Sequence, residues 1–95
     1  MIDVKTSLFK LGQVVATPGA NESLATAQTS AWELLSRHVA GDFGDVDAED
    51  WQANLDAING DARILSAYTL TTGDRLWVIT EADRSSSCIL RPDEY

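Results

Sequence analysis

The sequence predicts a two-layer α+β domain in the order β-α-α-α-β-β-β, with helices packed on one face of an antiparallel sheet. Two capped helical segments, each with a single apolar face, occupy the middle of the chain, and three β-rich runs follow in the last third. An amphipathic helix needs a flat apolar partner, which those strands provide. Because 95 residues support one hydrophobic core, we expect residues 1–95 to form a single domain.

The first predicted strand and the first predicted helix meet at a threonine–proline pair. Residues 11–16 (LGQVVA) are apolar enough for a short buried strand. Thr17 and Pro18 then mark a helix start, because threonine caps helices and proline suits the first helical position. Leu24 is the one large apolar anchor of this helix. We expect the strand to join the sheet at an edge or beside the last strand.

Two further helices carry clear start signals. Ser30 and Glu33 have the spacing of a capping box, and Gly41 is a natural residue to end that helix. The predicted buried face of this helix contains Trp32, Leu35 and Val39. Asp47 caps the next helix, and Asp50 adds negative charge to its first turn, where the macrodipole favours it. The predicted buried face of the helix that Asp47 caps contains Trp51, Leu55 and Ile58.

Three β-rich runs lie close together at 62–70 (ARILSAYTL), 74–82 (DRLWVITEA) and 86–91 (SSCILR). Their short connections predict an antiparallel meander. On the middle strand, alternation separates Leu76, Val78 and Thr80 on one face from Trp77, Ile79 and Glu81 on the other. The helices are expected to bury whichever set is more apolar.

Negative charge is concentrated in one part of the chain. The formal net charge is −8, and residues 42–61, which we name the acidic segment, account for −7 of it because they contain no lysine or arginine. The acids of this segment are Asp42, Asp45, Asp47, Glu49, Asp50, Asp56 and Asp61. Direct nucleic-acid binding needs clustered cations and is therefore not expected. The segment suits a basic protein partner, or it serves solubility.

The remaining composition favours a cytoplasmic protein without membrane contact. No apolar run approaches the roughly 20 residues that cross a bilayer, and the N-terminal residues lack the apolar stretch of a signal peptide. The single cysteine, Cys88, has no partner for an internal disulfide.

The stretch 37–50 (RHVAGDFGDVDAED) combines the only histidine with five carboxylates. As a calcium loop starting at Asp45 it fails at the sixth position, where Asp50 stands in place of the required glycine. One histidine and one distant cysteine are too few for a zinc site. We therefore expect neither a metal nor a cofactor.

Two interpretations of His38 stay open. It could be the general base of a small hydrolase or nuclease, with Asp42 or Asp45 orienting the imidazole and Arg84 contributing a cation from the sheet. Alternatively, it closes the last turn of its helix, where the dipole favours its cation and the ring can bond a terminal carbonyl. The second interpretation is the one we favour.

The uncovered face of the sheet is a further candidate surface. The residues assigned to it are Tyr68, Arg75, Trp77, Glu81 and Arg84. A tryptophan beside arginines is typical of an interface hot spot. The same composition also suits an ordinary half-buried strand whose arginines pair with nearby acids, so both interpretations stay open.

Five stretches are spread over nearly the whole length of the chain: LGQVVATPGA, RHVAGDFGD, ILSAYTL, GDRLWVITEADRS and ILRPDEY. Together they resemble a group of small bacterial proteins carried on plasmids and other mobile elements. The resemblance implies a cytoplasmic accessory protein and carries over no catalytic residue. Its pattern residues here are His38, Gly41, Asp42, Gly44, Asp45, Asp50, Asn54, Thr80, Glu81, Asp83, Arg84 and Ser85. The chain departs from the pattern at Phe43, where a tryptophan is expected, and at 86–88, where threonines are expected.

The leading hypothesis is a small non-enzymatic accessory protein of a mobile element that binds a basic protein through the acidic segment, with DNA mimicry as one version. The residues expected to bind are Asp42, Asp45, Asp47, Glu49, Asp50, Tyr68, Arg75, Trp77 and Arg84. The hydrolase or nuclease built on His38 is the alternative. A homodimer formed through the edge or face of the sheet is a third hypothesis.

Overall fold

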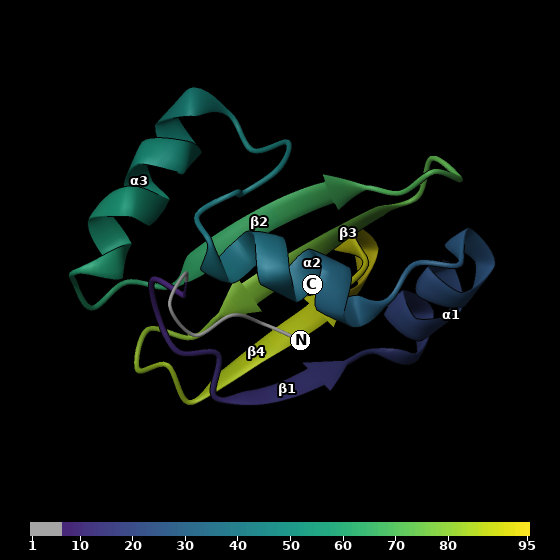
Figure 1. The fold of residues 1–95 in the computed structure, drawn as a ribbon, viewed down its shortest axis with the longest axis horizontal. Coiled ribbons are helices and arrows are strands. Elements are labelled where there is room, and N and C mark those ends of the chain that lie inside the picture. Colours follow the sequence, from purple (N-terminus) through teal and green to yellow (C-terminus); the bar gives the residue numbers. More distant parts are fainter. Residues whose placement is uncertain (1–6) are drawn as a thin grey trace.

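The computed structural model describes residues 7–95 and confirms the predicted α+β fold and order of elements (Figure 1). Over that range the elements are β1 (Gln13–Ala16), α1 (Pro18–Ala27), α2 (Ala31–Val39), α3 (Ala48–Ile58), β2 (Ile64–Thr69), β3 (Arg75–Thr80), β4 (Ser86–Leu90) and a final 3₁₀ turn, η1 (Pro92–Glu94). The predicted strands therefore form, with ends that differ by no more than two residues.

The four strands have the order β1-β4-β3-β2. β2, β3 and β4 form the predicted antiparallel meander, whereas β1 pairs with β4 in parallel, so the sheet is mixed rather than wholly antiparallel. Both expectations for the first strand are confirmed, since β1 is an edge strand and lies beside the last strand. The chain leaves β1 through helices instead of a hairpin turn, which is the kind of connection that a parallel pair requires.

α1 and α2 cover one face of the sheet, and α2 crosses in front of it (Figure 1). The main core lies between these helices and the sheet and consists of Ala20, Leu24, Leu34, Leu35, Tyr68, Leu70, Leu76, Val78 and Ile89. On β3 the covered set is Leu76, Val78 and Thr80, and all three residues are fully buried. α3 lies instead along β2, at the edge of the sheet (Figure 1).

The predicted helix caps form, with one difference in detail. Thr17 and Asp47 each accept a hydrogen bond from the amide three residues ahead, at 3.1 and 2.8 Å. Ser30 caps α2, but its hydroxyl accepts from the amide of Trp32 at 3.1 Å, so the predicted bond to the Glu33 amide is wrong. The Glu33 amide bonds to the backbone carbonyl of Ser30 at 3.1 Å instead.

Two residues expected in buried helix faces are exposed. Trp32 has an exposed fraction of 54% and Leu55 of 39%. The buried residues of α2 centre its inner face near Leu35, which leaves Trp32 on the flank. α3 packs mainly against β2 at the edge of the sheet, and its buried residues are Asn54 and Ala57.

Candidate functional site

His38 lies at the C-terminal end of α2, on the side that faces the sheet. Leu34 and Leu35, one turn earlier, belong to the core, and Gly41 turns the chain away from the helix with a φ of +88°. The imidazole is fully buried, with an exposed fraction of 0%, and the ring of Phe9 packs edge-on against it at 5.1 Å between centroids. The folded structure thus leaves no part of His38 open to a substrate from solution.

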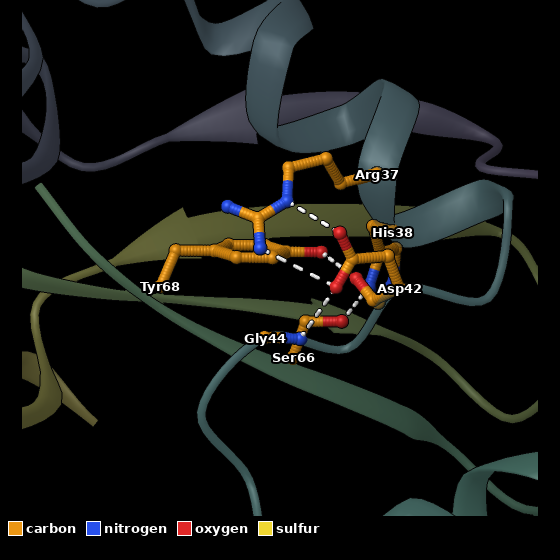
Figure 2. Close-up of polar contacts among 6 residues, drawn as sticks. All are labelled: Arg37, His38, Asp42, Gly44, Ser66 and Tyr68. Carbon is orange, nitrogen blue, oxygen red and sulfur yellow. Dashed lines mark hydrogen bonds and ion pairs between the residues drawn. The ribbon is translucent and has the colours of Figure 1, made fainter.

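Both imidazole nitrogens lie against hydroxyl groups of the sheet. Nδ1 is 2.5 Å from Ser66 Oγ on β2 (Figure 2), and Nε2 is 2.9 Å from Thr80 Oγ1 on β3. Thr80 Oγ1 is 2.7 Å from Ser87 Oγ on β4, which in turn bonds to the carbonyl of Leu11 at 2.8 Å. This buried hydrogen-bond chain connects α2 to three strands and to the segment before β1.

The donor and acceptor in each of these hydrogen bonds follow from the last group of the chain, the carbonyl of Leu11, which can only accept. The hydroxyl of Ser87 has one proton, which it donates to the carbonyl of Leu11. Thr80 therefore donates to Ser87, and the Nε2–H of His38 donates to Thr80. In the neutral ring, Nδ1 then accepts the proton of Ser66. Across the described residues, no buried side-chain nitrogen or oxygen is left without a partner.

Burial lowers the pKa of His38 from 6.5 to about 3, and the nearby cation of Arg84 adds to this effect. The neutral ring that results can accept the proton of Ser66 at Nδ1 while its Nε2–H donates to Thr80. Neither Asp42 nor Asp45 orients the imidazole, because both nitrogens bond to sheet hydroxyls. For the same reason the bond that we expected to a helix-end carbonyl is not the one that forms. The arrangement joins elements of the fold and offers no free nitrogen for proton transfer.

Mild acid is expected to destabilise the protein through His38. Its folded-state pKa lies below its unfolded value of 6.5, so the unfolded chain binds more protons between pH 6.5 and about pH 3. The free energy of unfolding should be about 1.4 kcal/mol lower at pH 5.5 than at pH 7.5, as urea denaturation at both values would measure. The carboxylate of Asp42, whose pKa is lowered by the hydrogen bond from Arg37, stays ionised at both of these pH values.

The matched variant for this measurement is His38→Gln, which has no group that titrates in the window. It should be less stable at both pH values but lose the difference between them. If the variant keeps the full difference, other groups produce it and the assignment to His38 is wrong.

Arg84 is committed to backbone carbonyls. It lies in the turn between β3 and β4 with a φ of +60°. Its guanidinium donates to the carbonyls of Ala57, Ala62 and Glu81 at 2.6, 2.8 and 3.1 Å. These bonds tie the end of α3 and the chain that follows it to the β3–β4 turn. The catalytic and binding hypotheses need the N–H groups of Arg84 for a ligand, but most of these groups bond to the backbone of the protein itself.

Asp42 is held by the residues around it (Figure 2). Nε and Nη2 of Arg37 donate to its carboxylate at 2.7 and 3.3 Å, and the amide of Gly44 donates to the same group at 3.1 Å. The hydroxyl of Tyr68 donates to its backbone carbonyl at 2.7 Å. The guanidinium of Arg37 lies over the ring of Tyr68, 4.5 Å from its centroid. Asp42 therefore closes the turn after α2 and is not a free surface charge.

Residues 43–45 pair with the outer edge of β2. The amide of Ala67 donates to the carbonyl of Phe43 at 3.1 Å, and the amide of Asp45 donates to the carbonyl of Ala67 at 2.7 Å. The carboxylate of Asp45 accepts the hydroxyl proton of Thr69 at 2.8 Å. The first part of the acidic segment thus supports a strand edge.

Three polar residues outside the expected binding and catalytic sets complete these contacts. The carboxamide of Asn54 exchanges two hydrogen bonds with the backbone of Leu65, at 2.7 and 3.1 Å, and so covers the next part of the β2 edge. Ser66 and Ser87 hold the buried chain around His38. One sequence signal could have identified these residues. Each is a polar residue at a position that the spacing of its strand or helix predicts to be buried, where it needs a hydrogen-bond partner.

Besides Asp45, five exposed acids of the acidic segment lie on α3 and its flanks, and they are Asp47, Glu49, Asp50, Asp56 and Asp61. The carboxylate of Asp47 caps α3, and that of Asp56 accepts from the side chain of Gln52 on its own helix. In the described part of the chain, Arg37 and Asp42 form the one salt bridge. None of these five carboxylates is therefore neutralised by a lysine or arginine in that part.

The structure corrects the expected surface on the uncovered face of the sheet. Tyr68 pairs with Leu76, which places it on the helix-covered face with an exposed fraction of 1%, and burial raises its pKa to about 12. Trp77 does lie on the other face, but it is half-buried because Tyr95 packs against it at 5.6 Å between centroids. Arg75 is exposed at the start of β3.

No family model, curated protein or solved structure matches this chain. The resemblance to proteins of mobile elements therefore stays a prediction. Among residues 7–95, no three histidine, cysteine or acidic residues gather so that they could hold a metal ion. The helices of the same range are all too short or too polar to cross a membrane.

Proposed function

We propose that the chain is a small non-enzymatic binding protein, and that the solvent side of α3 with its flanks contacts a basic protein surface. The observation that carries the proposal is the set of five exposed carboxylates that no cation of the described residues neutralises. The hydrolase alternative receives no support from His38, which is buried and bonded at both nitrogens.

The stability of α3 does not account for all of these charges. Glu49 and Asp50 lie in the first turn, where the macrodipole favours negative charge. Asp56 lies near the other end of the helix and Asp61 beyond it, where the dipole disfavours negative charge, and the last turn contains no basic residue. A partner that supplies lysine or arginine at this end would relieve the repulsion.

α3 is also held in a fixed position against the rest of the fold. Asn54 ties it to the backbone of β2, and the ring of Trp51 packs against Phe43 at 5.2 Å between centroids. Leu55, which is 39% exposed, adds an apolar contact among the carboxylates. Protein-binding surfaces combine an apolar contact with a polar rim, and Leu55 with the surrounding carboxylates has this arrangement on a fixed helix.

A more specific form of the proposal is DNA mimicry. Carboxylates along α3 would take the place of phosphates toward a nucleic-acid-binding protein, whose cationic groups normally displace the counterions of DNA. This role suits a cytoplasmic accessory protein of a mobile element, which is what the resemblance implies.

Neutralising α3 is expected to weaken binding about tenfold, because three exposed ion pairs of about 0.5 kcal/mol each would be lost. The variant is Glu49→Gln/Asp56→Asn/Asp61→Asn, which spares the cap residue Asp47 and the bonded residues Asp42 and Asp45. The control, Glu22→Gln/Asp74→Asn/Asp93→Asn, removes the same charge from exposed positions outside the segment.

The bait is the immobilised protein, and the sample is the fraction of a bacterial lysate that binds heparin, which is rich in cationic proteins. Wild type and control should retain the same protein, and the α3 variant should release it at lower salt. Purified partner and protein would then give the affinity by titration, and competing duplex DNA should displace the partner if mimicry holds. Equal retention by all three baits would show that the acidic segment is only a solvated surface.

A further inference from the structure

The two edges of the sheet differ in how they are covered. β2, at one edge, is paired by residues 43–45 through Ala67 and by Asn54 through Leu65. β1 is the opposite edge, and within residues 7–95 β4 is the one strand beside it. An uncovered edge strand is a template on which another strand can pair.

Two residues of β1 direct their backbone amides and carbonyls away from the sheet. The amides of Gln13 and Thr17 donate to carbonyls of the β4 side, at 3.0 Å each. Because backbone groups alternate in direction along a strand, the amides and carbonyls of Val14 and Ala16 point away from β4. Their side chains pack on the main core, so these outward groups belong to a fixed strand.

We propose that β1 pairs antiparallel with β1 of a second copy of this chain, about a two-fold axis at Val15. Val14 of each copy then exchanges two hydrogen bonds with Ala16 of the other, and the two four-stranded sheets become one continuous sheet. Val15, which is 43% exposed on the face away from the helices, meets its own counterpart across the axis. Registers centred on Val14 or Ala16 would place Val15 against Gln13 or Thr17 and leave it less well packed.

The charges near β1 suit this pairing. Lys10 is exposed just before β1, and the carboxylate of Glu94 lies beside its end, where it accepts the hydroxyl proton of Thr17 at 2.6 Å. Antiparallel pairing sets the start of one β1 beside the end of the other, so each Lys10 comes near the Glu94 of the second copy. The acidic segment packs at the β2 edge, which keeps the two main clusters of negative charge far from the interface.

Sedimentation across a wide dilution series, with amide hydrogen exchange on the same samples, tests the proposal on the unmodified chain. We expect the mass to approach twice that of the monomer as concentration rises, and the amides of Val14 and Ala16 to become protected together with it. A monomer at every concentration would overturn the proposal. So would a dimer in which these two amides stay unprotected, because another surface would then form it.

Variants of exposed residues separate the interface from the fold. Val15→Lys places two cations against each other at the axis and should give a folded monomer. Lys10→Glu should weaken the dimer about tenfold, whereas Arg75→Glu, the same change of charge on β3 away from β1, should not. A dimer unaffected by Val15→Lys would contradict the register.

A disulfide trap tests the register directly. Cα atoms of an antiparallel pair without mutual hydrogen bonds lie about 4.5 Å apart, which a disulfide can bridge. Val15→Cys, in a Cys88→Ser background because Cys88 neighbours Val15 on β4, should therefore cross-link two copies in a glutathione redox buffer. Trp32→Cys in the same background is exposed on α2 and should not cross-link at a comparable rate. Equal rates for the two variants would count against the pairing.

Discussion

Replacing His38 by alanine should lower the free energy of unfolding by about 3–5 kcal/mol. The substitution removes a fully buried ring and leaves a cavity beside Phe9. It also removes the partner of the Ser66 hydroxyl and of Thr80 Oγ1, in a place where water is excluded. A small domain has about 5–15 kcal/mol of stability, so the variant should be largely unfolded at a moderate concentration of urea.

The control for this prediction removes the polar partners together with the histidine. In His38→Leu/Ser66→Ala/Thr80→Val no buried hydroxyl at the ring is left without a partner, and Ser87 still bonds to Leu11. This triple variant should lose only about 1–2 kcal/mol, because an apolar replacement of both sides of a bond is nearly neutral apart from packing. Urea denaturation of both variants gives the comparison. If His38→Ala is at least as stable as the triple variant, the hydrogen-bond chain contributes little to the free energy of unfolding.

Features that depend on neighbours in the sequence could be predicted. Asp47 and Thr17 have the residue type and spacing of helix caps, and both act as caps. His38 shows the limit of such reasoning. Its place at the end of a helix follows from the apolar spacing, but its partners Ser66 and Thr80 lie 28 and 42 residues away. Only the strand register decides that these hydroxyls meet the ring.

The same limit explains the errors on the sheet and in the acidic segment. Alternation divides a strand into two faces, but the pairing of Tyr68 with Leu76 decides that Tyr68 is covered by helices. In the acidic segment, a count of charges cannot show that Asp42 is bound by Arg37 or that Asp45 supports the edge of β2. The acids whose role stays open are those of α3 and its C-terminal flank.

Replacing Gly44 by alanine should lower the free energy of unfolding by about 3–5 kcal/mol, because backbone strain and a steric clash act together. Gly44 has a φ of +72°, which L side chains rarely adopt. A Cβ atom there would lie 2.1 Å from the carbonyl oxygen of Ala67 and 2.7 Å from the ring of Tyr68. The oxygen belongs to the backbone of a central part of the β2 edge, so it cannot rotate away as a side chain would.

Gly73→Ala separates the effect of backbone strain from that of the steric clash. Gly73 also has a positive φ, but it has room for a Cβ atom. Its φ is +93°, and a Cβ atom there would meet no other atom within 4 Å. This variant should lose only about 1–2 kcal/mol. Urea denaturation measures both losses, and amide exchange at Asp45 and Ala67 reports whether the loop has left β2 in Gly44→Ala. Equal losses in the two variants would mean that residues 43–45 move aside at little cost, and the β2 edge would then be as open as β1.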